Sequence, residues 1–185
     1  MNKIWLSLLF GFCMFISAHA QQIAVKNNVV YDAAAILNIG GEFVINKQFS
    51  VDLSGNFIGW EVANRTWKHW MVQPEGRYWL LEGFNGHFFG VHGMYLNYDV
   101  SRLEVPFVNF SRRNHYKGTA YGGGVSYGYS VYVTPRLNIE FTVGMGYLNF
   151  DYDKTYIREN RYDGHFKKSY FGPTKLGVSI VYIIK

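Results

Sequence analysis

The stretch LNIEFTVGMGYL, residues 137–148, decides the fold. Every second residue in it is large and apolar or aromatic: Leu137, Ile139, Phe141, Val143, Met145 and Tyr147. The residues between them are small or polar: Asn138, Glu140, Thr142, Gly144 and Gly146. Because successive side chains of a β-strand point to opposite faces, this period of two predicts a strand with one bulky and one small face.

The same pattern recurs along the chain, in LNIGGEFVI (37–45), FSVDLSGNF (49–57) and YGGGVSYGYSVY (121–132). Counting such segments gives eight expected strands, at about 24–33, 36–46, 49–60, 69–81, 87–99, 119–133, 136–150 and 169–184. A composition with 19% aromatic residues and 20 glycines fits a sheet protein. We therefore expect an all-β fold, an eight-stranded antiparallel up-and-down β-barrel.

The two faces of these strands indicate what surrounds the barrel. A soluble barrel places its large apolar groups inside, whereas an outer-membrane barrel turns them to lipid. Eight strands enclose little room, which favours small and polar residues inside and therefore a transmembrane barrel. Charges of both signs on the small face are expected to pair in the lumen: Glu42, Asp52, Glu75, Arg77, Glu140 and Lys175. Interfacial girdles are expected from Trp60, Trp67, Trp70 and Trp79.

The N-terminus MNKIWLSLLFGFCMFISAHA has the pattern of a secretory signal peptide. A basic Lys3 precedes an apolar run from residue 4 to 17, and Ala18-His19-Ala20 forms an A-x-A cleavage site. A retained anchor is the alternative, but the run is shorter than the roughly 20 residues a spanning helix needs. We expect cleavage after residue 20, so that residues 21–185 form one barrel domain in the outer membrane of a Gram-negative bacterium.

Basic residues concentrate in the long connections expected on the outer side. Those connections hold 11 Lys and Arg against 5 Asp and Glu. Basic clusters attract anionic lipid head groups, so lipopolysaccharide or a surface partner is the expected contact. The candidate contacts are Arg102, Arg112, Arg113, Lys117, Arg158, Arg161, Lys167 and Lys168. Nucleic acid is not an expected partner, because the chain is expected to be secreted and offers no single basic helix.

The C-terminus KLGVSIVYIIK, residues 175–185, resembles the terminal assembly signal of outer-membrane barrels. Its matching positions are Lys175, Gly177, Ile180 and Tyr182. A plain edge strand is the alternative interpretation. The resemblance implies that the barrel assembly machinery is a partner.

Several stretches together resemble a family of small outer-membrane β-barrel proteins of Bacteroidota-type bacteria that is catalogued as a domain of unknown function. They are VKNNVVYDA (25–33), RYWLL (77–81), GGGVSYGYS (122–130), RLNIEFTVGMGYL (136–148) and SYFGPTK (169–175). The resemblance implies an eight-stranded barrel and a link to fimbrial or other surface assemblies. It implies no catalytic residues.

The expected function is non-enzymatic: a structural or accessory surface protein without cofactor or metal. The histidines lack the helical spacing of a metal site. One alternative is a lipid-modifying enzyme of the lipid A acylase or deacylase kind, using Ser111 and His115 with Asp99 or Asp163. A second alternative is a periplasmic ligand-binding barrel.

Overall fold

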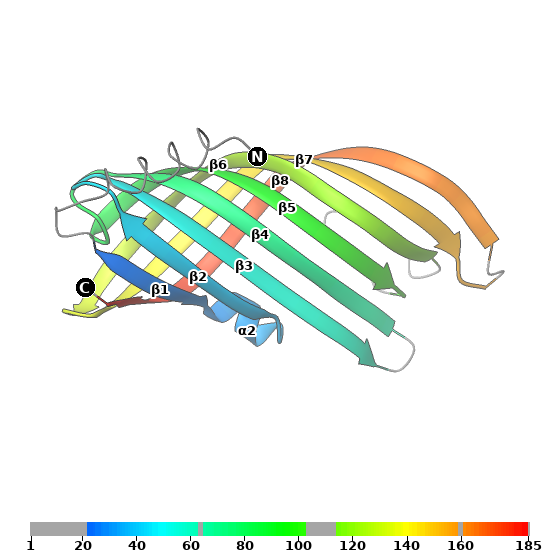
Figure 1. Cartoon of the computed structure of the whole chain (residues 1–185), viewed down its shortest axis with the longest axis horizontal. Coiled ribbons are helices and arrows are strands. Elements are labelled where there is room, and N and C mark those ends of the chain that lie inside the picture. Colours follow the sequence, from blue (N-terminus) through cyan, green and yellow to red (C-terminus); the bar gives the residue numbers. More distant parts are fainter. Residues whose placement is uncertain (1–21, 63–64, 103–113, 159–160, 185) are drawn as a thin grey trace, which may run out of the picture.

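The computed structural model describes residues 22–62, 65–102, 114–158 and 161–184. These residues form eight strands and one short helix (Figure 1). Their bounds are β1 Ile23–Asn28, α2 Val29–Ala33, β2 Leu37–Val44, β3 Phe49–Val62, β4 Arg65–Trp79, β5 Gly86–Ser101, β6 Asn114–Thr134, β7 Leu137–Tyr156 and β8 Arg161–Ile183. The described part of the chain is thus almost wholly strand.

The eight strands form one sheet that closes on itself as a barrel, in chain order from β1 to β8. Each strand is antiparallel to the next. The ring closes where β1 pairs with β8, from Ala24↔Ile183 to Asn28↔Ser179. The prediction of an all-β fold with eight antiparallel strands in a ring is confirmed.

Two of the expected boundaries are wrong. Residues 29–33, expected to continue the first strand, form α2, whose first turn is capped by the Asn28 side chain accepting a hydrogen bond from Val30 N (3.1 Å). Most of 151–168, expected to be a loop, is strand, because β7 and β8 continue to Tyr156 and back from Arg161. The last hairpin therefore projects well beyond the β1–β2 hairpin (Figure 1).

The two ends of the barrel differ in their connections. At one end, the turn end, short connections at 45–48, 80–85 and 135–136 join the strands, and the C-terminus lies beside them (Figure 1). An Asx turn builds the first of these, in which Asn46 Oδ1 accepts from Gln48 N (3.0 Å) and Phe49 N (2.9 Å). The opposite end, the loop end, carries α2 and the connections β3–β4, β5–β6 and β7–β8.

Large apolar side chains cover the outside of the barrel. Their exposed members come from all eight strands; examples are Val25, Ile39, Leu53, Val72, Val91, Val125, Val143 and Leu176. Polar and charged residues of the same strands are buried inside, including Glu42, Asp52, Gln73, Arg77, Asn138 and Glu140. The faces are thus arranged as the alternation predicts. Among the described residues, no helix is long and apolar enough to cross a membrane.

The interior is filled in three layers. At the turn end, Trp79, Phe84 and Phe88 pack with smaller apolar residues. Toward the loop end lies an apolar cluster of Met71, Met94, Tyr98, Val100, Tyr116, Ala120, Leu148 and Phe150. Between the two lies a layer of charged side chains. Two of the four tryptophans expected in interfacial girdles lie elsewhere: Trp79 is completely buried and Trp67 packs against the interior cluster, while Trp60 and Trp70 are exposed.

Candidate functional site

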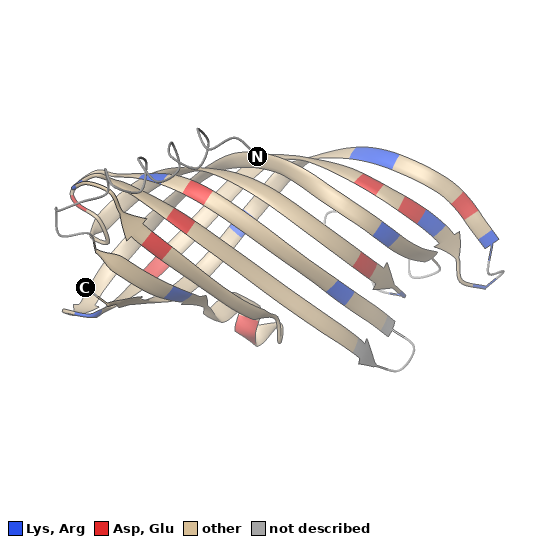
Figure 2. Cartoon of the chain, in the orientation of Figure 1, with Lys and Arg blue, Asp and Glu red and all other residues tan. Residues whose placement is uncertain are grey.

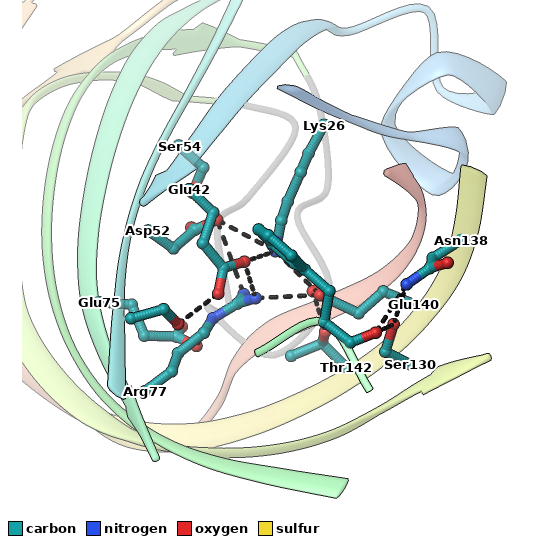
Figure 3. A network of polar contacts seen from close by, with 12 residues as sticks. Lys26, Glu42, Asp52, Ser54, Glu75, Arg77, Ser130, Asn138, Glu140 and Thr142 are labelled. Atoms are coloured by element: carbon teal, nitrogen blue, oxygen red, sulfur yellow. Dashed lines mark hydrogen bonds and ion pairs between the residues drawn. The ribbon is translucent and has the colours of Figure 1, made fainter. Parts of the chain in front are cut away.

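Arg77 on β4 stands at the centre of the charged layer, which we call the lumen network (Figure 3). Its Nη1 lies 2.8 Å from Glu42 Oε2 and 3.0 Å from Glu140 Oε2, and its Nε lies 2.8 Å from Glu75 Oε1. One guanidinium thus joins carboxylates from β2, β4 and β7. The Cζ atom of Arg77 also lies 4.4 Å from the centre of the Phe88 ring, so the guanidinium packs against the apolar layer at the turn end.

Two lysines complete the lumen network. Lys26 on β1 contacts Glu42, and its Nζ lies 2.8 Å from Glu140 Oε2 and 3.4 Å from Asp52 Oδ2. Lys175 on β8 pairs with Glu75. The lumen network, defined as Lys26, Glu42, Asp52, Glu75, Arg77, Glu140 and Lys175, therefore contains three cations and four carboxylates.

The strand register explains why these cations are needed. Glu42 lies directly opposite Asp52, and Asp52 directly opposite Glu75, so three carboxylates stand side by side on β2, β3 and β4. Like charges in opposed positions destabilise a sheet, and buried charges without a partner cost several kcal/mol. Arg77 and Lys26 reach into this row from other positions and bond to its members.

Small residues on the facing strands make room for the long side chains. A Cβ on Gly90 would lie 2.6 Å from Glu75 Oε1, and one on Gly144 would lie 3.0 Å from Lys175 Cβ. Beside the network, toward the loop end, a cavity of about 40 Å³ remains, enough for about one water molecule. Asp52 Oδ2 lines it; among the described residues this oxygen accepts no hydrogen bond and has only the ion pair with Lys26 at 3.4 Å and a longer one with Arg77 at 3.8 Å.

All six residues expected in the lumen lie inside the barrel and belong to this one network. Sequence reasoning missed Lys26, which contacts three of the four carboxylates. The sequence feature that could have identified it is its spacing. Lys26 follows the small Ala24 by two residues, so both side chains lie on one face of the first strand. It also missed His92, whose Nε2 lies 2.9 Å from Thr174 Oγ1.

The described members of the basic set expected to contact lipopolysaccharide belong to the loop-end parts of β5, β6, β7 and β8 and their connections, where Figure 2 shows several Lys and Arg. Arg102, Lys117, Arg158, Arg161 and Lys167 are exposed, and Lys168 is half-buried. The Lys167 side chain is 77% exposed, and its Nζ lies 3.6 Å from Asp151 Oδ2. Arg112 and Arg113 lie outside the described residues.

Charges on the outside of the loop end alternate in sign from strand to strand. The register places Lys68 opposite Asp99, Asp99 opposite Lys117, and Lys117 opposite Asp153, which faces His165. Opposite charges in facing positions stabilise neighbouring strands. We call this row of five residues the rim row.

The projecting β7–β8 hairpin is held by polar contacts at its outer end. Tyr162 Oη donates to Asp153 Oδ1 (2.9 Å), and His165 Nδ1 lies 3.1 Å from the same oxygen. These hydrogen bonds, that of Tyr162 first, hold the pKa of Asp153 below its usual value. Across the hairpin, Lys154 Nζ lies 2.8 Å from Asp163 Oδ2, and this bond raises the pKa of Lys154.

Of the residues considered for an enzymatic set, two come together. His115 Nε2 lies 2.6 Å from Asp99 Oδ1 on the outside of the loop end. Ser111 lies outside the described residues, and Asp163 pairs with Lys154. In the described part of the chain, no group of three or more His, Cys, Asp or Glu is arranged to hold a metal ion.

The residues of the expected assembly signal lie on the last strand. Lys175 and Gly177 face inward, whereas Ile180 and Tyr182 are exposed on the outside. Both outward residues lie in the part of β8 that pairs with β1 and so closes the ring. Recognition of this strand by an assembly machinery stays a prediction.

Comparison with known proteins places the chain in a family. A search of curated proteins found no match. A family model described as "Protein of unknown function (DUF3575)" matches residues 5–184. Since this match covers nearly the whole chain, the protein belongs to the DUF3575 family of proteins of unknown function.

Proposed function

We propose that the protein is a non-enzymatic outer-membrane β-barrel, structural or accessory to a surface assembly such as a fimbria, whose basic loop end contacts lipopolysaccharide or a partner protein. In this arrangement a signal peptide at residues 1–20 directs secretion, the turn end faces the periplasm and the loop end faces outward. The proposal needs no cofactor.

The outward apolar surface is the observation that carries the proposal. On β7 the outward side chains run from Leu137 to Tyr147 without a charge. Eleven residues at about 3.3 Å each, tilted by about 40°, span roughly 25 Å, the height of the apolar band of an outer-membrane barrel. Exposed apolar side chains come from the other strands too. A surface so apolar is costly in water and stable in lipid.

The filled interior favours a closed barrel over a pore or a carrier. The lumen network lies between two apolar layers, and the cavity beside it measures about 40 Å³. Ligand pockets usually measure about 300–1,000 Å³. This interior therefore supports a closed structural barrel rather than a porin or a periplasmic ligand-binding barrel.

The charge of the loop end supports an anionic contact there. Arg102, Arg158 and Lys167 are exposed basic residues at that end, and rows of Lys and Arg near a membrane surface attract anionic head groups. At the turn end the exposed basic residues include Lys47 and Arg136. The two ends thus offer matched positions for a test.

Membrane insertion is tested first. Outer-membrane fractionation and gel migration with and without boiling should show a heat-modifiable band in the outer-membrane fraction. Val143→Lys places a charge at mid-height of the apolar band and should destabilise the inserted barrel by about 2–4 kcal/mol. The control Tyr162→Lys changes an exposed residue outside the band and should insert normally. A protein that folds in buffer without detergent would refute the membrane proposal.

Lipopolysaccharide contact is tested by charge reversal. The double variant Arg102→Glu/Lys167→Glu should bind vesicles that contain lipid A more weakly than the unchanged protein. The matched variant Lys47→Glu/Arg136→Glu makes the same charge change at the turn end and should bind as before. Equal loss in both variants would show only a net-charge effect.

The His115–Asp99 contact favours one second candidate, a lipid-modifying enzyme with Ser111 as the nucleophile. A carboxylate at 2.6 Å can orient a histidine that acts as a general base. Mass spectrometry of lipid A from cells with the unchanged protein and with His115→Ala decides between the two functions. Unchanged lipid A supports the non-enzymatic proposal.

A further inference from the structure

The strands of the barrel differ in how far they extend at the loop end. β1 and β2 span 6 and 8 residues, whereas β8 spans 23. β1 pairs with β8 only up to Ser179. Among the described residues, no strand pairs with β8 from residue 162 to 178 on the side that faces away from β7. A strand with such an edge can accept a further strand.

Within the apolar band, this edge is closed by other means. The Asn28 side chain accepts from Val178 N (3.3 Å) and donates to Leu176 O (3.2 Å), so it takes the place of a neighbouring strand. Pro173 has no N–H, and its carbonyl accepts from Tyr170 Oη (3.3 Å). Closure is what a lipid-facing edge requires, because hydrocarbon offers no hydrogen bonds.

Above the band, along residues 162–171, which we call the open edge, no strand in the described part of the chain lies on the side away from β7. Bonding directions alternate along an antiparallel strand, and Ile183 N donates to the carbonyl of Arg136, the residue directly before β7. With the register shift opposite Met145, the main-chain groups of His165, Lys167 and Ser169 then point away from β7. The open edge thus offers a series of backbone donors and acceptors at the loop end.

The side chains of the open edge indicate the chemistry of a strand that would fit. Lys167 and Phe171 point outward and are highly exposed, at 77% for the Lys167 side chain and 72% for Phe171. Lys167 carries the positive charge of this outward face, because Lys168 lies opposite the inward-facing Phe150; Asp151 contacts Lys167 from β7, on the side away from the open edge. A complementary strand carries an acidic side chain opposite Lys167 and an apolar one opposite Phe171.

We propose that the open edge of β8 binds an extended, acidic segment of a partner protein as an additional β-strand. Main-chain hydrogen bonds supply the affinity and the alternating side chains the specificity, as in other cases of strand addition. This inference rests on the proposed function, because it needs the loop end to face the outside. Strand addition to β8 would then be the way in which the barrel holds a surface partner.

The probe is a synthetic ten-residue peptide that alternates Glu and Val, with a Lys–Val peptide of the same length as its counterpart. Binding to the full-length protein in detergent micelles is measured by fluorescence anisotropy. The Glu–Val peptide should bind and the Lys–Val peptide should not. Ser169→Pro removes one edge-facing N–H and should weaken binding of the Glu–Val peptide about tenfold, whereas Ser169→Ala keeps the N–H and should not.

Lys167→Glu is the second variant, since it leaves the backbone unchanged. Lys167→Glu should weaken binding of the Glu–Val peptide and allow the Lys–Val peptide to bind. No binding of the Glu–Val peptide, equal binding of both peptides, or equal binding to Ser169→Pro and Ser169→Ala would overturn the inference. A disulfide-linked dimer of Ser169→Cys would show that a second copy of this chain occupies the edge, which also overturns it.

Labelling distinguishes this inference from the proposed function. A membrane-impermeant maleimide applied to intact cells should label Lys167→Cys and not Lys47→Cys. Failure of that pattern refutes the outward-facing loop end, and with it the proposed function. Peptide binding in micelles does not depend on orientation, so its failure refutes strand addition alone.

Discussion

The lumen network and the rim row are both ladders of charge across neighbouring strands, yet they are built differently. In the lumen, Glu42, Asp52 and Glu75 carry the same sign in facing positions. On the rim, the signs of Lys68, Asp99, Lys117 and Asp153 alternate. The interior row therefore depends on cations that reach in from elsewhere, whereas the rim row is balanced along its own length.

The comparison shows how burial changes the value of the same chemistry. Inside, Arg77 serves three carboxylates that water cannot reach. On the rim, water solvates each charged group, so each ion pair contributes little to the free energy of unfolding. A cation removed from the lumen should therefore cost far more than one removed from the rim.

Arg77→Met should show the largest effect. It leaves Glu42, Glu75 and Glu140 buried without their shared partner, and breaking buried ion pairs costs about 3–5 kcal/mol. Urea unfolding of the barrel in micelles, followed by tryptophan fluorescence, measures the change in free energy of unfolding. Arg136→Met, at an exposed turn, serves as the control and should change it by less than about 0.5 kcal/mol.

Neutralising the carboxylates as well should restore part of the loss. In Arg77→Met/Glu42→Gln/Glu140→Gln two of the three carboxylates that lost their partner are neutral, and the third, Glu75, keeps Lys175, so the barrel should be more stable than Arg77→Met alone. A triple variant less stable than the single one would show that Arg77 matters for packing rather than for charge.

Lys175→Met and Lys167→Met give a matched pair on one strand. Each lysine has a carboxylate partner, Glu75 for the first and Asp151 for the second. Glu75 keeps its bond to Arg77, so Lys175→Met should cost about 1–3 kcal/mol, less than Arg77→Met. Lys167→Met should cost about 0.5 kcal/mol or less. Equal costs in urea unfolding would remove the distinction between lumen and rim.

Much of this comparison follows from the sequence. Alternation alone assigns Glu75 and Arg77 to one face, and the narrow interior of eight strands predicts which face is inward. The same parity places Trp79 inside with Arg77, so its expected place in a girdle conflicted with the pattern. Tryptophan in a strand is equally compatible with either surface, and only parity distinguishes them.

Other features could not be predicted because they depend on register. Alternation says which face Glu42, Asp52 and Glu75 occupy, but not that they stand opposite one another. The open edge follows from the shortness of β1, which ends where Asn28 caps α2. The strands beyond the band look like loops because they are charged, although Phe150 and Tyr152 still alternate with Asp151 and Asp153.

Added salt should weaken the ion pairs of the rim more than those of the lumen, and this difference should be smaller than the effects of the substitutions above. A double-mutant cycle for Lys167 and Asp151 should give a few tenths of a kcal/mol in low salt and close to zero in 1 M NaCl, where the Debye length is about 3 Å. A cycle for Lys175 and Glu75 should change little over the same range, because the pair is buried. If the coupling energy of the lumen pair fell with added salt as steeply as that of the rim pair, solvent and ions would have to reach the lumen network.

The smallest effect concerns the titration of Asp153 on the rim. Hydrogen bonds from Tyr162 and His165 hold its pKa in the folded protein below the unfolded value of about 3.9. Its contribution to stability is therefore present above that unfolded value and is lost as the pH falls through the folded one. Tyr162→Phe removes the first of these bonds and should move the pKa back toward 3.9, as measured by carbon-13 NMR of the Asp153 carboxyl in micelles. An unchanged pKa would mean that water, rather than Tyr162, already satisfies this carboxylate, and the hairpin would then owe its order to strand pairing alone.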